Sequence, residues 1–261
     1  MEWWASEIAI LMAGVADGAI GLSTLALYQT TNSTMFMFSM GYQVSGATRV
    51  GQNLGSGRPK TARRAAMMGP SLALLTSCVL AVILLTFRNE IPYLFTGSDG
   101  PGQRELAIRV AATYGYLSLY VVGDGVSNSF GGVIQGSGKQ SYGAVVVIVS
   151  YFVIALPICY FAGLQGGGGY MSIVMGMTVG TCIQCCGNGL IVLLTNYEAE
   201  SALAAGRAQK QQYEVLQTEK PAELGGGVVV SSLQDHRESD ALEMGAMVKV
   251  AGLGGGEGSE F

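Results

Sequence analysis

The 261-residue chain is 49% hydrophobic and only 12% charged, with a mean hydropathy of +0.39. This composition excludes an ordinary soluble domain, and a net charge of −4 gives no basic surface for nucleic acid. The five cysteines lie inside apolar runs and the single histidine is His236, so neither a disulfide framework nor a zinc site is expected. The sequence therefore predicts a membrane protein.

Apolar runs of transmembrane length recur along the first 196 residues. Because about 20 residues of helix cross the hydrocarbon, these runs predict an all-α fold, a polytopic membrane bundle of six transmembrane helices. The expected spans are about 2–19, 20–48, 65–87, 106–134, 142–162 and 170–194. Residues 197–261 become polar and rich in glycine, which predicts a cytoplasmic tail with a short helix followed by disorder.

A basic, glycine-rich stretch from Gly46 to Arg64 is expected to form the loop between the second and third spans. Glycines allow a chain to turn back where a helix ends, and short loops rich in Lys and Arg stay on the cytoplasmic side. The glycines and basic residues of this loop are Gly51, Gly55, Gly57, Arg49, Arg58, Lys60, Arg63 and Arg64. A second turn, with Gly136, Gly138 and Lys139, is expected on the same side, so both termini are predicted to be cytoplasmic.

Several strings resemble landmarks of eukaryotic multidrug and toxic compound extrusion (MATE) transporters. RVGQNLGSG at 49–57 resembles the loop after the family's eighth helix, EWWASE at 2–7 the start of its seventh, and GGVIQGSGKQ at 131–140 a landmark near its tenth. The likeness runs from Glu2 to Arg207. The family has twelve spans in two lobes and this chain resembles the second, so the resemblance implies a first, N-terminal lobe as a missing partner.

Acidic residues inside the spans are the candidate site. A carboxylate at membrane depth costs about 2.5 to 3.5 kcal/mol on insertion scales, so we expect Glu7 and Asp124 to face the bundle interior. Asp124 lies about 18 Å from Gly136 at the helical rise, close to the middle of a bilayer. The alternatives are an interfacial Glu7 and a hydrogen-bonded, purely structural Asp124. Asp17 is expected to be solvated at an interface.

The resemblance adds two further residues to this substrate and ion site. Glu2 is included because both glutamates at the start of the family's seventh helix are present. Gln29 or Thr30 stands where the eighth helix commonly has a glutamate, and the polar run from Gln29 to Thr34 predicts a helix that lines a polar cavity. Asp124 stands where a tenth-helix glutamate is usual, which keeps the charge on a shorter side chain.

The resemblance implies a secondary active antiporter that exports organic cations, xenobiotics or metabolites in exchange for protons or sodium ions. Burial favours the neutral form of a carboxyl, so such a group can exchange a proton for a cation. No enzymatic activity and no cofactor are expected, and the location is a plasma or vacuolar-type membrane. The alternatives are a non-transporting membrane subunit that pairs with a full-length relative, and a flippase for lipid-linked substrates.

The expected orientation can be tested by labelling a single cysteine. In a cysteine-free background, Arg58→Cys should react with a membrane-impermeant maleimide only after the cells are permeabilised, because the basic loop is cytoplasmic. Asn89→Cys, in the loop predicted on the outer side, is the matched control and should react in intact cells. Labelling of Arg58→Cys in intact cells would show that the predicted orientation is inverted.

Overall fold

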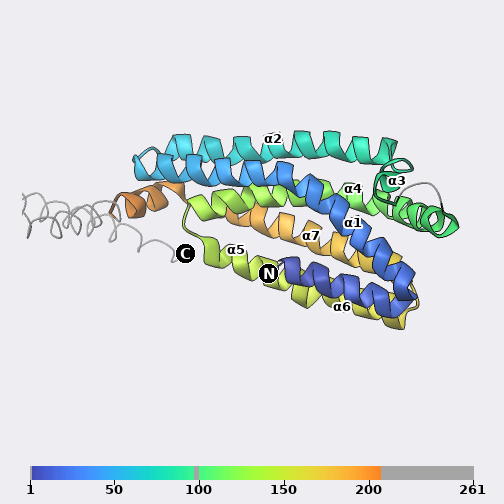
Figure 1. Ribbon diagram of the computed structural model, residues 1–261. Helices are drawn as coiled ribbons and strands as arrows, with labels where there is room; N and C mark the ends of the chain where they lie inside the picture. Colours follow the sequence, from blue (N-terminus) through green and yellow to red (C-terminus); the bar gives the residue numbers. More distant parts are fainter. Residues whose placement is uncertain (1, 97–99, 207–261) are drawn as a thin grey trace, which may run out of the picture. The chain divides into compact units, whose positions relative to one another are not determined.

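Helices make up the regular structure of the chain (Figure 1). The computed structural model describes residues 2–96 and 100–206, and no strand occurs in these ranges. The elements are α1 (Glu2–Gly55), α2 (Pro59–Thr86), α3 (Ile91–Thr96), α4 (Pro101–Gly136), α5 (Gln140–Val147), the π-helix η1 (Ile148–Ala155), α6 (Leu156–Ile158), the π-helix η2 (Cys159–Gln165) and α7 (Gly169–Leu194). A last helix runs from 197 to 206. The predicted all-α fold is confirmed, whereas the predicted disorder lies outside the described residues.

Five helices in the described ranges are long and apolar enough to cross a membrane: α1, α2, residues 102–136 of α4, the continuous helix 140–165, and α7. The 54 residues of α1 would extend about 81 Å if straight, far more than the thickness of a bilayer. Gly18, with φ 64° and ψ −153°, breaks the helix, and the chain reverses direction there (Figure 1). The two arms of α1 occupy the first two predicted spans, which is how five helices accommodate the six-span pattern.

The basic stretch from Gly46 to Arg64, which the sequence predicts to form the loop between the second and third spans, is mostly helical. α1 continues through Gly51 to Gly55 and α2 begins at Pro59, so the connection is only 56–58. The Gly57 N–H donates to the Leu54 carbonyl (3.1 Å) and the Arg58 N–H to the Asn53 carbonyl (2.9 Å). These two bonds form a Schellman motif, and Gly57 takes its left-handed position with φ 68°. The motif ends the helix within a few residues, so a longer loop is not needed.

The second predicted turn uses the same device. The Gly138 N–H donates to the Gln135 carbonyl and the Lys139 N–H to the Ile134 carbonyl, each at 3.0 Å, and Gly138 has φ 75°. Gly51, Gly55 and Gly136 remain helical, so the positive φ expected of turn glycines is not found at these three positions. The turn conformation itself falls on Gly57 and Gly138, because the left-handed position comes one residue after the cap of each helix.

Both of these turns and the segment after α7 gather at one end of the bundle. Val50, Leu54, Val133, Val192 and Tyr197 form a buried cluster there. Burial raises the pKa of Tyr197 to about 12, so its phenol stays neutral and donates to the Val192 carbonyl at 3.1 Å.

The helix 197–206 is bound to both turns at this end. Ser201 donates to the Leu54 carbonyl at 3.1 Å, and Lys139 pairs with Glu200 at 3.2 Å. The Leu54 carbonyl thus accepts two hydrogen bonds, one from the Gly57 N–H within the turn and one from the Ser201 hydroxyl. The bond from Ser201 ties the helix 197–206 to the first of the two turns.

α1 and α4 approach each other closely through small residues. A Cβ added at Gly132 would overlap the Gln43 carbonyl, and one added at Gly136 would lie 2.5 Å from the Ala47 oxygen. The two glycines are four residues apart on one face of α4. Small residues at this spacing bring helix backbones into contact in membranes, where van der Waals packing rather than the hydrophobic effect drives association.

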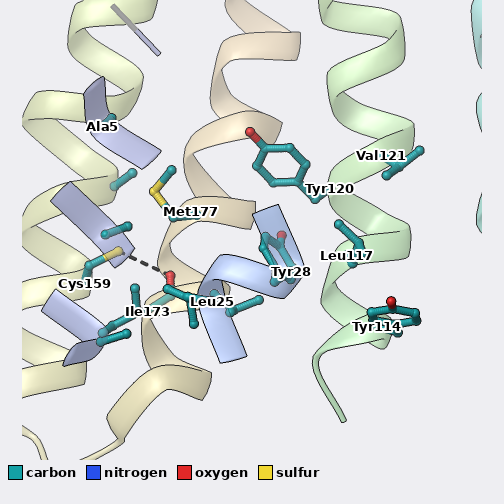
Figure 2. Close-up of a cluster of buried hydrophobic side chains, with 14 of the residues drawn as sticks. Ala5, Leu25, Tyr28, Tyr114, Leu117, Tyr120, Val121, Cys159, Ile173 and Met177 are labelled. Carbon is teal, nitrogen blue, oxygen red and sulfur yellow. Dashed lines mark hydrogen bonds between the residues drawn. The ribbon is translucent and has the colours of Figure 1, made fainter. Parts of the chain in front are cut away.

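A second, larger cluster of buried side chains fills the other part of the bundle. Figure 2 shows Tyr28, Tyr114 and Tyr120 beside Leu117 and Met177. The Cys159 thiol, also drawn there, donates to the Ile173 carbonyl at 3.3 Å, and the five cysteines are free. The buried phenols place hydroxyl groups inside an apolar core, so this cluster borders the polar site described below.

Neighbouring glycines on α4 provide a matched test of the close contact with α1. Gly131→Ala should stabilise the protein by up to about 1 kcal/mol, because alanine favours helix and its Cβ approaches only the flexible Gln43 amide, at 3.9 Å. Gly132→Ala should destabilise it by about 1–3 kcal/mol, because the Cβ meets backbone atoms that must move. Thermal unfolding in detergent measures both. A higher melting temperature for Gly132→Ala than for wild type would contradict this contact.

Candidate functional site

Two carboxylates, Glu2 and Asp124, line one small pocket inside the bundle. Glu2 comes from the beginning of α1 and Asp124 from α4, and the Asp124 side chain is only 3% exposed. Gln29 and Asn32, from the second arm of α1, line the same pocket. Its volume of about 20 Å³ is enough for one water molecule or small ion. The fold thus brings together acidic and amide groups from segments far apart in the sequence.

Three side chains from different elements donate hydrogen bonds to Glu2. The Tyr120 hydroxyl donates at 3.2 Å, the Tyr151 hydroxyl at 3.0 Å and the Gln184 amide at 3.5 Å. The Tyr151 hydroxyl also lies 3.0 Å from Gln184 Oε1 and 2.9 Å from the Thr181 hydroxyl. A phenol has one proton, so Tyr151 can donate to Glu2 or to Gln184 but not to both at once. The network therefore has more than one proton arrangement.

Asp124 has fewer partners than Glu2. Its Oδ1 atom is buried without a hydrogen bond from the described residues, as are Asn32 Oδ1, the Tyr28 hydroxyl and Asn128 Nδ2. Buried polar atoms are nearly always satisfied in native proteins, so unpaired ones indicate a place for water, a proton or an ion. Several of them around one carboxylate point to a site that accepts a ligand.

The pocket contains acidic groups without a basic partner. Glu2 and Asp124 interact electrostatically. The ion pairs among the described residues, Arg109–Glu105 and Lys139–Glu200, lie elsewhere, and neither basic residue lines the pocket. Two neighbouring carboxylates repel each other when both are ionised, and the repulsion is strong in a medium of low dielectric. A proton or a cation at the pocket removes this repulsion, so the site is suited to bind either one.

Flanking glycines let neighbouring helices approach Asp124. A Cβ at Gly123 would lie 3.2 Å from the Thr181 side chain of α7. A Cβ at Gly125 would overlap the Ser77 hydroxyl of α2. The Gly-Asp-Gly sequence thus places the carboxylate where three helices meet.

Glu7 does not lie where the sequence analysis expected it. Its side chain is exposed on the surface of the described residues, whereas Glu2 points into the pocket. At 100° per residue, Glu2 falls on the same face as the buried Ala9 and Ala13, and Glu7 falls about 140° away. The alanine spacing that includes Ala5, Ala9 and Ala13 is the signal that could have selected Glu2 as the buried glutamate.

Asp17 is not merely solvated at an interface. Its Oδ2 accepts the backbone N–H of Tyr170 at 2.6 Å, in the first turn of α7. A helix N-terminus has unpaired N–H groups and a partial positive charge, both of which favour a carboxylate. Asp17 therefore ties the end of the first arm of α1 to the beginning of α7, next to the reversal at Gly18.

The remaining expectations concern Gln29 and its polar neighbours. Gln29 lines the pocket and is partly buried, together with Asn32 and Ser33 from the polar run. The sequence analysis missed the residues that donate to Glu2, namely Tyr120, Tyr151 and Gln184, and Thr181, which is hydrogen-bonded to Tyr151. Gln184 stands out as an amide within an apolar span, but nothing in the sequence shows that Tyr151 and Tyr120 reach the same atom.

Apolar helices of transmembrane length around a buried acidic pocket define a class of protein, the polytopic membrane transporters. Comparison with known proteins narrows this class. Residues 1–161 match the sequence pattern of the MatE family. The chain belongs to this family, which confirms the resemblance to MATE transporters.

Two relatives and one solved structure illustrate the match. Protein DETOXIFICATION 14 of Arabidopsis thaliana is 29% identical over 228 residues, which cover 85% of this chain and 45% of that protein. Protein DETOXIFICATION 36 of the same plant is 31% identical over 208 residues, 79% of this chain and 40% of that protein. The crystal structure of the eukaryotic MATE transporter AtDTX14 matches 79% of this chain and 45% of its own, with 29% identity and a TM-score of 0.75. The chain thus spans less than half the length of these relatives.

The donor network around Glu2 can be tested by removing one hydroxyl. Tyr151→Phe should destabilise the protein by about 1.5–3 kcal/mol, the usual loss for a hydrogen bond to a charged group. Tyr142→Phe, at an exposed tyrosine, is the matched control and should leave the melting temperature unchanged. Equal melting temperatures for both variants in detergent would show that Tyr151 does not stabilise Glu2.

Proposed function

We propose that this chain is the C-terminal lobe of a secondary antiporter, which exports organic cations or metabolites in exchange for protons or sodium ions. The observation that carries the proposal is the pair Glu2 and Asp124 in one buried pocket without a basic partner. Charged side chains inside membrane proteins generally mark the path of a substrate or ion. A pair that binds either a proton or a cation supplies the competition on which antiport depends.

The proposed exchange follows from the groups around the pair. A proton on Asp124 would turn it into a donor, for which Asn32 Oδ1 is an unsatisfied acceptor in the same pocket. A sodium ion would instead take oxygen ligands, which the two carboxylates and the Gln29 and Asn32 amides can provide. In both cases the ligand neutralises the pocket, so its binding and release can shift the bundle between inward-open and outward-open states.

Alternating access requires a second body for this lobe to move against. The family match and the coverage of less than half of each relative support a first lobe as that body. We therefore expect the 261-residue chain alone to insert and fold but not to transport. The competing proposal is a non-transporting subunit that pairs with a full-length relative. It predicts no transport even when a first lobe is supplied.

The test uses this chain joined to the first lobe of a family member and reconstituted in liposomes with a pH gradient and a fluorescent organic cation. Gradient-driven uptake is expected for the joined protein. Asp124→Asn should reduce that uptake at least tenfold, because asparagine preserves the shape of aspartate but binds no proton. Glu105→Gln, at an exposed carboxylate paired with Arg109, is the matched control and should transport as wild type does.

Three outcomes would count against the proposal. Uptake by Asp124→Asn at the wild-type rate would show that the buried carboxylate does not couple transport. Uptake by the chain alone would refute the need for a second lobe. Failure of the joined protein to transport, with wild-type folding, would favour the subunit.

A further inference from the structure

A second pocket lies at the end of the bundle opposite the basic turns, where α2 leads through α3 into α4. Its volume is about 370 Å³. The residues that line it and carry the argument are Arg88, Asn89, Tyr93, Arg104, Ile108 and Ala112. None of them belongs to the pocket of Glu2 and Asp124. Its chemistry is also different, because the charged groups that line it are basic.

Arg88 and Arg104 converge on this pocket from the turn after α2 and from the first turns of α4. Within the described ranges neither guanidinium forms an ion pair, whereas the neighbouring Arg109 is bound to Glu105 at 3.1 Å. Glu105 is thus held by another cation and does not neutralise the two arginines. Arginine guanidinium groups bind phosphate through parallel hydrogen bonds, and the Asn89 amide and the Tyr93 hydroxyl are further possible donors.

Beyond Arg104, the α4 wall of the pocket becomes apolar. Arg104, Ile108 and Ala112 follow one another at intervals of four residues, so they lie along one face of α4. Ile108 is 60% exposed, and beside the pocket the α3 residues Leu94 and Phe95 are exposed as well. Along this face the side chains change from cationic at the end of the helix to apolar toward its middle. A phospholipid in a bilayer has a matching order of groups, with an anionic phosphate at the interface and an acyl chain below it.

We propose that this pocket binds the head group of an anionic phospholipid, with an acyl chain along Ile108 and Ala112. The two arginines bind the phosphate, and the position of the pocket at the end of the long apolar helices α2 and α4 places that phosphate at the membrane interface. A zwitterionic lipid binds less well, because the ammonium group of its head group is repelled by the two arginines and leaves the head group with no net negative charge. The site is independent of the transport proposal, since it shares no residue with the acidic pocket.

The test measures lipid retention by the purified 261-residue chain with native mass spectrometry in detergent. Phosphatidylglycerol should be retained at least tenfold more than phosphatidylcholine. The double variant Arg88→Gln/Arg104→Gln should abolish that preference. The matched control, Arg58→Gln/Arg64→Gln, removes the same charge from exposed positions at the other end and should preserve it. Circular dichroism checks that each variant remains helical.

Two further measurements distinguish a lipid site from a site for small anions. Ile108→Asn should lower retention of phosphatidylglycerol at least threefold, because it makes the apolar wall polar. Excess glycerol 3-phosphate should not displace the lipid, because it has no acyl chain. The proposal is overturned if glycerol 3-phosphate displaces the lipid, if Ile108→Asn has no effect, or if both double variants lose the preference equally.

Discussion

The burial of acidic groups within an apolar bundle is the constraint on which the rest of the structure depends. Glu2 receives hydrogen bonds from Tyr120, Tyr151 and Gln184, which come from three separate helical segments. An unpaired charge inside a membrane is costly, so the segments must converge if Glu2 is to be ionised. Asp124 is less well hydrogen-bonded than Glu2, because its Oδ1 atom has no partner among the described residues. The hydrogen bonds of the pocket are therefore concentrated on one carboxylate of the pair.

Small residues make this convergence possible. Alanines on the first arm of α1 and glycines on α4 allow backbones to approach more closely than larger side chains would permit. The reversal at Gly18 then folds the first arm back against the bundle, and Asp17 binds it to α7. Glu2 reaches Asp124 because of this reversal, since a straight α1 would carry it far beyond the pocket.

The two ends of the bundle differ in chemistry. At one end, tight glycine turns present basic residues and the helix 197–206 binds to both turns. At the other, two arginines face a pocket with an apolar wall. Cationic groups thus lie at the two ends of the bundle, and the acidic pair lies in its interior.

The sequence by itself determined the fold class, the family and the role of Asp124 as a candidate, because apolar run length, glycine spacing and motif order are local properties. It also indicated the polar lining at Gln29. It could not decide which glutamate is buried, since the choice between Glu2 and Glu7 depends on which face of the first arm packs against α4 and α7. It likewise missed Tyr120 and Tyr151, which look like ordinary apolar residues until three segments meet at one carboxylate. The tertiary structure decided these points, because hydrogen bonds between residues more than a hundred positions apart depend on how helices cross rather than on any pattern within one helix.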